Sequence, residues 1–184
     1  MVIRTDSFIQ DRITTGVAIE DMSTDFPGLT PAQSDLIQHW RICCRDGFLP
    51  LREQLDPGEM RAHLAAISIV ELRQDGEAHF RLVGSGLRPV FGCDMRGRRL
   101  GELNPPAFEM WSLGLERSCD EQRPVGGLIE RTHDTHAWLR LPLRRTARAV
   151  QVLCHDTLIP NARFRGGSDT EFDTPLVSDH NLAA

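Results

Sequence analysis

Between residues 67 and 159, apolar and polar residues alternate in a way that predicts β-strands. The pattern is clearest where Leu139, Leu141 and Leu143 alternate with Arg140, as expected for a strand whose two faces meet different surroundings. An Asp-Gly pair at residues 75–76 is typical of a tight hairpin turn. The predicted strands are residues 67–73, 78–84, 125–132, 136–145 and 149–159.

A threonine and a proline at residues 30–31 predict the start of an α-helix. Threonine is a favoured N-cap residue, and proline is favoured at the first helical position. Leu36, Ile37 and Trp40 then recur at the spacing of one helical face, and the helix is expected to end by Gly47.

Two further helices are predicted from their capping residues. Asp56 followed by Pro57 predicts a helix start, with Met60 and Leu64 facing the core. An asparagine and two prolines at residues 104–106 begin a single predicted helix that continues through residue 119. With short hairpins at residues 133–135 and 146–148, the predicted order is β-β-α-β-β-β, which is an α+β fold.

The polar ends of the chain predict one folded domain with two tails. Residues 1–29 are expected to form a flexible arm, residues 30–159 the domain, and residues 160–184 a polar C-terminal tail. We find neither a signal peptide nor an apolar stretch of about 20 residues that would span a membrane. The expected location is therefore the cytoplasm.

The charge and the cysteines of the chain argue against a nucleic-acid partner, a disulfide framework and a zinc site. The formal net charge of −5 gives no electrostatic reason to expect a nucleic-acid partner. The five cysteines are scattered and contain no C-x-x-C pair, which favours free thiols in a reducing compartment over disulfides or a zinc site.

Residues 80–103 read FRLVGSGLRPVFGCDMRGRRLGEL, a strand end followed by a glycine turn, a short amphipathic stretch and two more glycine breaks. This order resembles the centre of a PAS sensor domain, most closely the compact alphaproteobacterial members of that family. Further motifs extend the resemblance to roughly residues 40–158. They are Trp40, Gly47, Leu49-Pro50, Arg52, Asp56-Pro57, Arg81-Leu82-Val83-Gly84, Gly92, Asp94, Gly97-Arg98 and Leu141-Pro142-Leu143.

The resemblance implies a PAS-like five-stranded antiparallel sheet with helices on one face and an N-terminal flanking helix. It also implies a non-enzymatic sensory or regulatory module that binds a small ligand, a protein partner or both. Without an output domain of its own, the module would act on a separate signalling protein, and a homodimer is expected. In that fold Leu36, Ile37 and Trp40 of the flanking helix would cap the sheet or pair with a second subunit.

Two common PAS cofactors are disfavoured. The helix after the GRRL motif lacks the N-C-R-F-L type motif that carries the reactive cysteine of photoactive flavin members, and residues 105–121 lack the histidine of the haem-binding members. The cofactor therefore stays unknown. The residues expected to line a ligand cavity are Arg81, Arg88, Phe108, Trp111 and Arg140.

For two of these residues a second interpretation stays open. Arg81 and Arg140 lie within strands, where they would either bind a carboxylate or phosphate ligand or pair with glutamates on neighbouring strands. The second interpretation is favoured, because cross-strand charge pairs are common in sheets.

Two groups of histidines each allow a functional and a structural interpretation. His133 and His136 flank Asp134 at a spacing that could hold a metal, but a solvated hairpin tip is favoured because no third ligand is in view. His155 with Asp156 could form an acid–base pair, but a polar pair at a strand end is favoured. We therefore expect no catalytic residue and no metal site. For the function of the whole protein, two alternatives to a sensory module stay open. They are an interaction adaptor with a filled cavity and a small enzyme with a histidine base.

Overall fold

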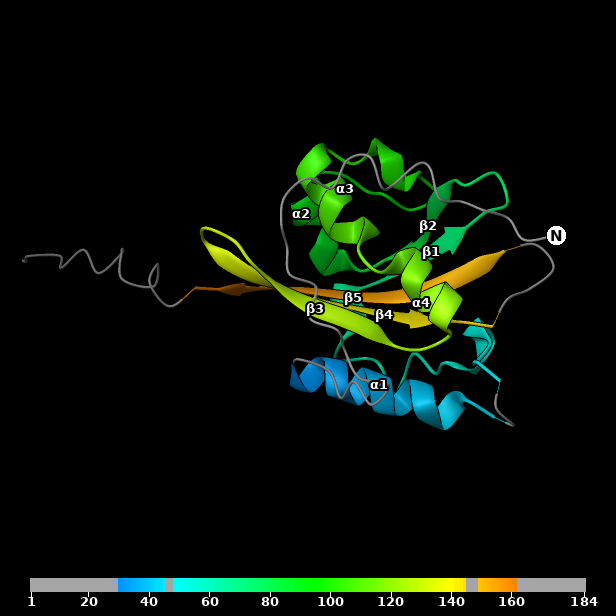
Figure 1. Ribbon diagram of the computed structural model, residues 1–184. Coiled ribbons are helices and arrows are strands. Elements are labelled where there is room, and N and C mark those ends of the chain that lie inside the picture. The colour runs from blue at the N-terminus through cyan, green and yellow to red at the C-terminus, as the bar shows by residue number, and fades with distance from the viewer. Residues whose placement is uncertain (1–29, 46–47, 145–148, 162–184) are drawn as a thin grey trace, which may run out of the picture.

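The computed structural model describes residues 30–45, 48–144 and 149–161. The centre of this part is a five-stranded sheet in the order β2-β1-β5-β4-β3, in which all neighbours are antiparallel (Figure 1). This confirms the predicted α+β fold with a PAS-like sheet. The strands are β1 (Ile67–Leu72), β2 (Ala78–Val83), β3 (Val125–Glu130), β4 (Asp134–Pro142) and β5 (Val150–Pro160).

Helices lie on both faces of the sheet. Figure 1 shows α1 (Pro31–Cys43) on one face, while the helices between β2 and β3 gather on the other. Two clusters of buried side chains correspond to these two faces. The remaining α-helices are α2 (Arg88–Phe91), α3 (Pro105–Ser112) and α4 (Leu115–Glu121), and the short 3-10 helices are η2 (Arg52–Gln54), η3 (Leu64–Ala66), η4 (Ser85–Leu87) and η5 (Leu100–Glu102).

The flanking helix α1 begins as predicted, with Thr30 Oγ1 accepting a hydrogen bond from the Gln33 backbone N–H at 3.2 Å. Its apolar face is buried against the chain's own sheet: Leu36 and Ile37 are fully buried, and Trp40 Nε1 donates to the Pro142 carbonyl at 2.8 Å. The three residues named from the sequence therefore cap the sheet. Pairing with a second subunit has to use other residues of the helix.

The predicted helix after Asp56 does not form. Residues 57–63 make hydrogen-bonded turns that lead into η3 (Leu64–Ala66). Asp56 Oδ1 accepts from the Gly58 N–H at 2.7 Å, which closes a local turn over two residues instead of capping a helix. The apolar residues still point inward: Met60 is buried and Leu64 packs against the same cluster.

The long helix predicted after Asn104 is wrong in its extent. Its start is correct, since Asn104 Oδ1 accepts from the Ala107 N–H at 3.0 Å, but α3 ends at Ser112 and α4 begins at Leu115. Gly114 has a φ of +67°, a conformation that ends a right-handed helix and that glycine adopts most readily. A Cβ there would also lie 2.5 Å from the Trp138 ring, so the break is fixed by packing against β4.

Gly84 directly follows β2, and the structure shows why the PAS-like motif has a glycine at this position. A Cβ on this residue would overlap the carbonyl oxygens of Leu64 and Ala65, because η3 passes directly over the end of the strand. Its backbone N–H donates to the Ile67 carbonyl at 2.7 Å. The absence of a side chain therefore lets residues 64–66 pack against residues 84–86.

The predicted tails and one hairpin are largely outside the described residues. These are the arm at residues 1–29, the hairpin at 146–148 and residues 162–184. At the C-terminal end, β5 continues to Pro160, one residue past the predicted end of this strand, and Asn161 N–H donates to the His133 carbonyl at 3.0 Å. No helix among the described residues is long and apolar enough to cross a membrane.

Candidate functional site

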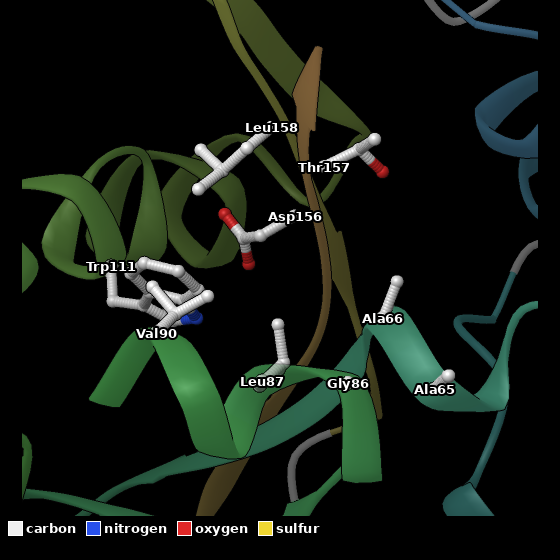
Figure 2. A pocket seen from close by; sticks show the side chains of 9 residues that line it. All are labelled: Ala65, Ala66, Gly86, Leu87, Val90, Trp111, Asp156, Thr157 and Leu158. Carbon is white, nitrogen blue, oxygen red and sulfur yellow. The ribbon is translucent and has the colours of Figure 1, made fainter. Parts of the chain in front are cut away.

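A pocket of about 280 Å³ lies between the helices that follow β2 and strand β5 (Figure 2). Its wall consists mostly of small and apolar side chains from η3, η4, α2 and α3, and its base is β5. The lining residues are Ala65, Ala66, Gly86, Leu87, Val90, Trp111, Asp156, Thr157 and Leu158.

Trp111 provides one polar atom of the pocket. The side chain is fully buried, and its indole Nε1 has no hydrogen-bond partner. Phe91 packs edge-on against the indole with ring centroids 4.6 Å apart, and His136 stacks on it at 5.7 Å. These two contacts hold the ring in place, and Figure 2 shows its nitrogen turned toward the space enclosed by the lining residues.

Asp156 provides the other polar group. Figure 2 shows its carboxylate extending from β5 toward Trp111, while the neighbouring Thr157 points the other way. Oδ1 accepts from His136 Nε2 at 2.9 Å and from both terminal nitrogens of Arg140 at 3.0 Å. Burial raises the pKa of the Asp156 carboxyl, but the Arg140 charge and the His136 hydrogen bond outweigh it and hold that pKa below its usual value.

Arg140 lies behind Asp156 and is fully buried. Besides Asp156, its guanidinium donates to the carbonyls of Leu113 at 2.9 Å, Leu139 at 2.9 Å and Met110 at 3.2 Å. These contacts engage all five N–H groups of an arginine. Arg140 thus pairs with a strand neighbour, as favoured from the sequence, although the partner is an aspartate and not a glutamate.

The sheet register explains why these groups meet. In the β4–β5 ladder, Trp138 lies opposite Asp156, with Arg140 and His136 two residues to either side of Trp138. Residues two apart in a strand share a face, so Arg140 and His136 flank Asp156 on the side covered by α3. The break after α3 then exposes carbonyls of residues 110–113 to the arginine.

The other predicted cavity residues lie elsewhere. Arg81 forms a two-pronged pair with Glu71, at 2.8 Å from Nε and 2.6 Å from Nη2, on the face of the sheet that α1 covers. Arg88 is exposed at the start of α2, and Phe108 is half-buried beside the core without lining the pocket. Of the five candidates, the structure brings together Trp111 and Arg140, through Asp156.

The histidine interpretations need correction. His136 is not at a solvated hairpin tip but fully buried within β4, and Asp156 is not at a strand end but inside β5. His155 faces the α1 side, where burial lowers its pKa to about 4. Among the described residues, no three metal-binding side chains are grouped closely enough to hold an ion.

One sequence signal indicates that Asp156 is buried and paired. A charged residue in the middle of a long apolar stretch, residues 149–159, requires a partner when buried, and Arg140 is the matching exception in the preceding strand. The alanines and glycine of the pocket wall carry no such signal, because nothing in their own sequence predicts how closely η3 approaches η4.

Comparison with known proteins identifies one family. Residues 29–110 match the family model described as PAS domain, a stretch that runs from the start of α1 to the residue before Trp111. No curated protein and no solved structure matches the chain. The matched stretch contributes β1, β2 and the part of the pocket wall from Ala65 to Val90, and the five-stranded sheet has the antiparallel arrangement expected of that family. Residues 29–110 of this chain therefore match the PAS domain family, and the five-stranded sheet is the PAS-like fold.

Proposed function

We propose that this protein is a ligand-sensing PAS module that binds a small molecule in the pocket between α2, α3 and β5. The match of residues 29–110 to the PAS domain supports a sensory or regulatory role in general. The observation that carries the finer proposal is the buried Trp111 indole N–H, which has no partner and faces the pocket beside Asp156. A buried donor without an acceptor costs about 1–3 kcal/mol, a cost that a bound acceptor removes.

The contacts of Arg140 supply a route by which occupancy changes the fold. The same guanidinium binds the pocket residue Asp156 and the carbonyls of Met110 and Leu113 at the end of α3. A ligand that shifts the Asp156 carboxylate therefore alters the contacts between β5 and the junction of α3 and α4. We propose that this change is read by a separate signalling protein, in the cytoplasm and without any chemical turnover.

An interaction role is the second candidate, and exposed apolar side chains favour it. Ile42 and Phe48, at and just after the end of α1, are 68% and 60% exposed, and Leu128 on the edge strand β3 is 50% exposed. These residues are available to a partner or to a second copy in a homodimer, whereas Leu36, Ile37 and Trp40 are not. In this alternative the pocket has no ligand.

The test is mass spectrometry of small molecules released from natively purified protein. Wild type is compared with Val90→Phe, which fills the pocket, and with Leu128→Phe, which makes a change of similar size on the exposed face of β3. We expect a molecule released from wild type and Leu128→Phe but absent from Val90→Phe. Release of nothing from any of the three, or equal release from all three, contradicts the proposal.

A further inference from the structure

We infer that the ligand of this pocket presents a hydroxyl group on a compact apolar body, with the hydroxyl accepting from Trp111 Nε1 and donating to the Asp156 carboxylate. This inference rests on the proposed function, since it names the chemistry of the molecule that the pocket binds. It is argued from the volume of the pocket, its two polar groups and the charges behind them.

The volume limits the ligand to roughly one ring with small substituents. An apolar cavity of about 150 Å³ accommodates benzene, and typical ligand pockets begin near about 300 Å³. The present pocket is about 280 Å³, and Ala65, Ala66, Leu87, Val90 and Leu158 give it a mainly apolar wall. Most of the ligand surface must therefore be apolar as well.

The two polar groups require opposite partners. An indole N–H donates only, and an ionised carboxylate accepts only. Oδ1 of Asp156 already has its donors in His136 and Arg140, whereas Oδ2 accepts from Arg140 Nη1 alone, at 3.1 Å. A hydroxyl is the smallest group that accepts and donates at once, so it satisfies both sides from a single position.

The surrounding charges disfavour ionic ligands. Every N–H of Arg140 is engaged by Asp156 and by backbone carbonyls, so no guanidinium donor is left for an anionic group. An anion would also face the Asp156 carboxylate across the pocket. A cation gains little, because Arg140 already neutralises that carboxylate at 3.0 Å.

Four probes of nearly equal size separate these contributions: phenol, anisole, toluene and benzoate. Phenol accepts and donates, anisole only accepts, toluene does neither, and benzoate is anionic. Binding is followed by the indole N–H signals of the full chain in proton–nitrogen correlation spectra. The chain has three tryptophans, and Trp40, whose indole N–H is bound to the Pro142 carbonyl, provides an internal control.

We expect phenol to shift the Trp111 indole signal while the Trp40 signal stays in place. Phenol should bind about tenfold more tightly than anisole, and anisole about tenfold more tightly than toluene, since each net hydrogen bond is worth roughly tenfold. Trp111→Phe, which keeps an aromatic ring without the N–H, should weaken phenol binding about tenfold, because the hydrogen bond donated to Asp156 remains. If that variant does not fold, the ranking of the four probes on wild type decides alone.

The outcomes separate this inference from the proposed function. Toluene or benzoate binding as tightly as phenol, with a shift of the Trp111 signal, overturns the hydroxyl assignment and leaves the pocket as a ligand site. If no probe shifts the signals of Trp111 or of the other lining residues, both the inference and the proposed function are contradicted. A phenol effect on Trp40 equal to that on Trp111 places binding elsewhere and overturns the inference.

Discussion

Replacement of Arg140 by methionine tests whether the buried charge network holds the domain together. Methionine approximates the length of the arginine side chain but removes every N–H group. The substitution leaves the Asp156 carboxylate buried with His136 as its remaining partner and removes the donor to the carbonyls of Met110 and Leu113. Both losses fall among buried side chains, since Arg140 is 0% exposed and Asp156 is 4% exposed.

Breaking a buried ion pair by removing one partner costs about 3–5 kcal/mol. Because whole domains are stable by about 5–15 kcal/mol, this loss is a large part of the total. The matched control is Arg81→Met, which removes a similarly close pair with Glu71 from a position where the arginine side chain is 40% exposed. The Glu71 side chain is only 9% exposed, but Arg73 and Gln151 still donate to it after this change, so a smaller loss is expected.

The assay is urea denaturation followed by circular dichroism, with the free energy of unfolding extrapolated to water. We expect Arg140→Met to lose about 3–5 kcal/mol and the double variant Arg140→Met/Asp156→Leu to recover much of that loss, because no charge is then left buried. The recovery should be incomplete, since the carbonyls at the end of α3 still lack a donor. A loss in Arg140→Met no larger than in Arg81→Met would refute the role assigned to the network.

Two further predictions concern packing and pH. Gly84→Ala should lower the free energy of unfolding by about 2 kcal/mol or more, because the added Cβ overlaps backbone atoms of η3. The control Gly101→Ala, which has open space around the new Cβ, should change the free energy of unfolding by about 0.5 kcal/mol or less. Equal effects of the two changes in urea denaturation would contradict the close approach of η3 to Gly84. Burial lowers the pKa of His155 from 6.5 to about 4 in the folded state, so the unfolded chain binds its proton first and stability is lost as pH falls from 6.5 to 4. The loss reaches about 3 kcal/mol in wild type, at about 1.4 kcal/mol for each pKa unit, and His155→Leu should lack it; parallel pH profiles of the two proteins would exclude His155 as the cause.

The sheet could be predicted from the sequence because its signals are local. Alternation along residues 136–145 and the Asp-Gly turn at residues 75–76 depend only on neighbours in the chain. The helices are less predictable where tertiary contacts determine whether a helix forms and where it ends. Apolar spacing continues past Gly114, yet the chain breaks there because β4 packs against the glycine. At Asp56 the capping residues are right for a helix, but a side-chain turn to Gly58 forms instead.

The candidate site was partly predictable for a similar reason. Trp111 and Arg140 were chosen as an aromatic residue on the helix and a charge within a strand, and both lie at the site. The sequence pattern favours a strand end for Asp156 and a hairpin tip for His136, because their burial depends on the β4–β5 register, which a single strand pattern does not reveal. Arg81 has the same sequence signature as Arg140 but lies on the opposite face, where Glu71 binds it.

The central claim is that the space between Trp111 and Asp156 holds the sensed molecule. The most direct measurement is a crystal structure of natively purified protein. During purification the protein is neither denatured nor dialysed against small molecules that could displace the ligand. The account predicts electron density for a compact molecule within hydrogen-bond distance of Trp111 Nε1 and Asp156 Oδ2. A pocket filled by the protein's own side chains, or a molecule bound only at the exposed surface near Ile42, would contradict it.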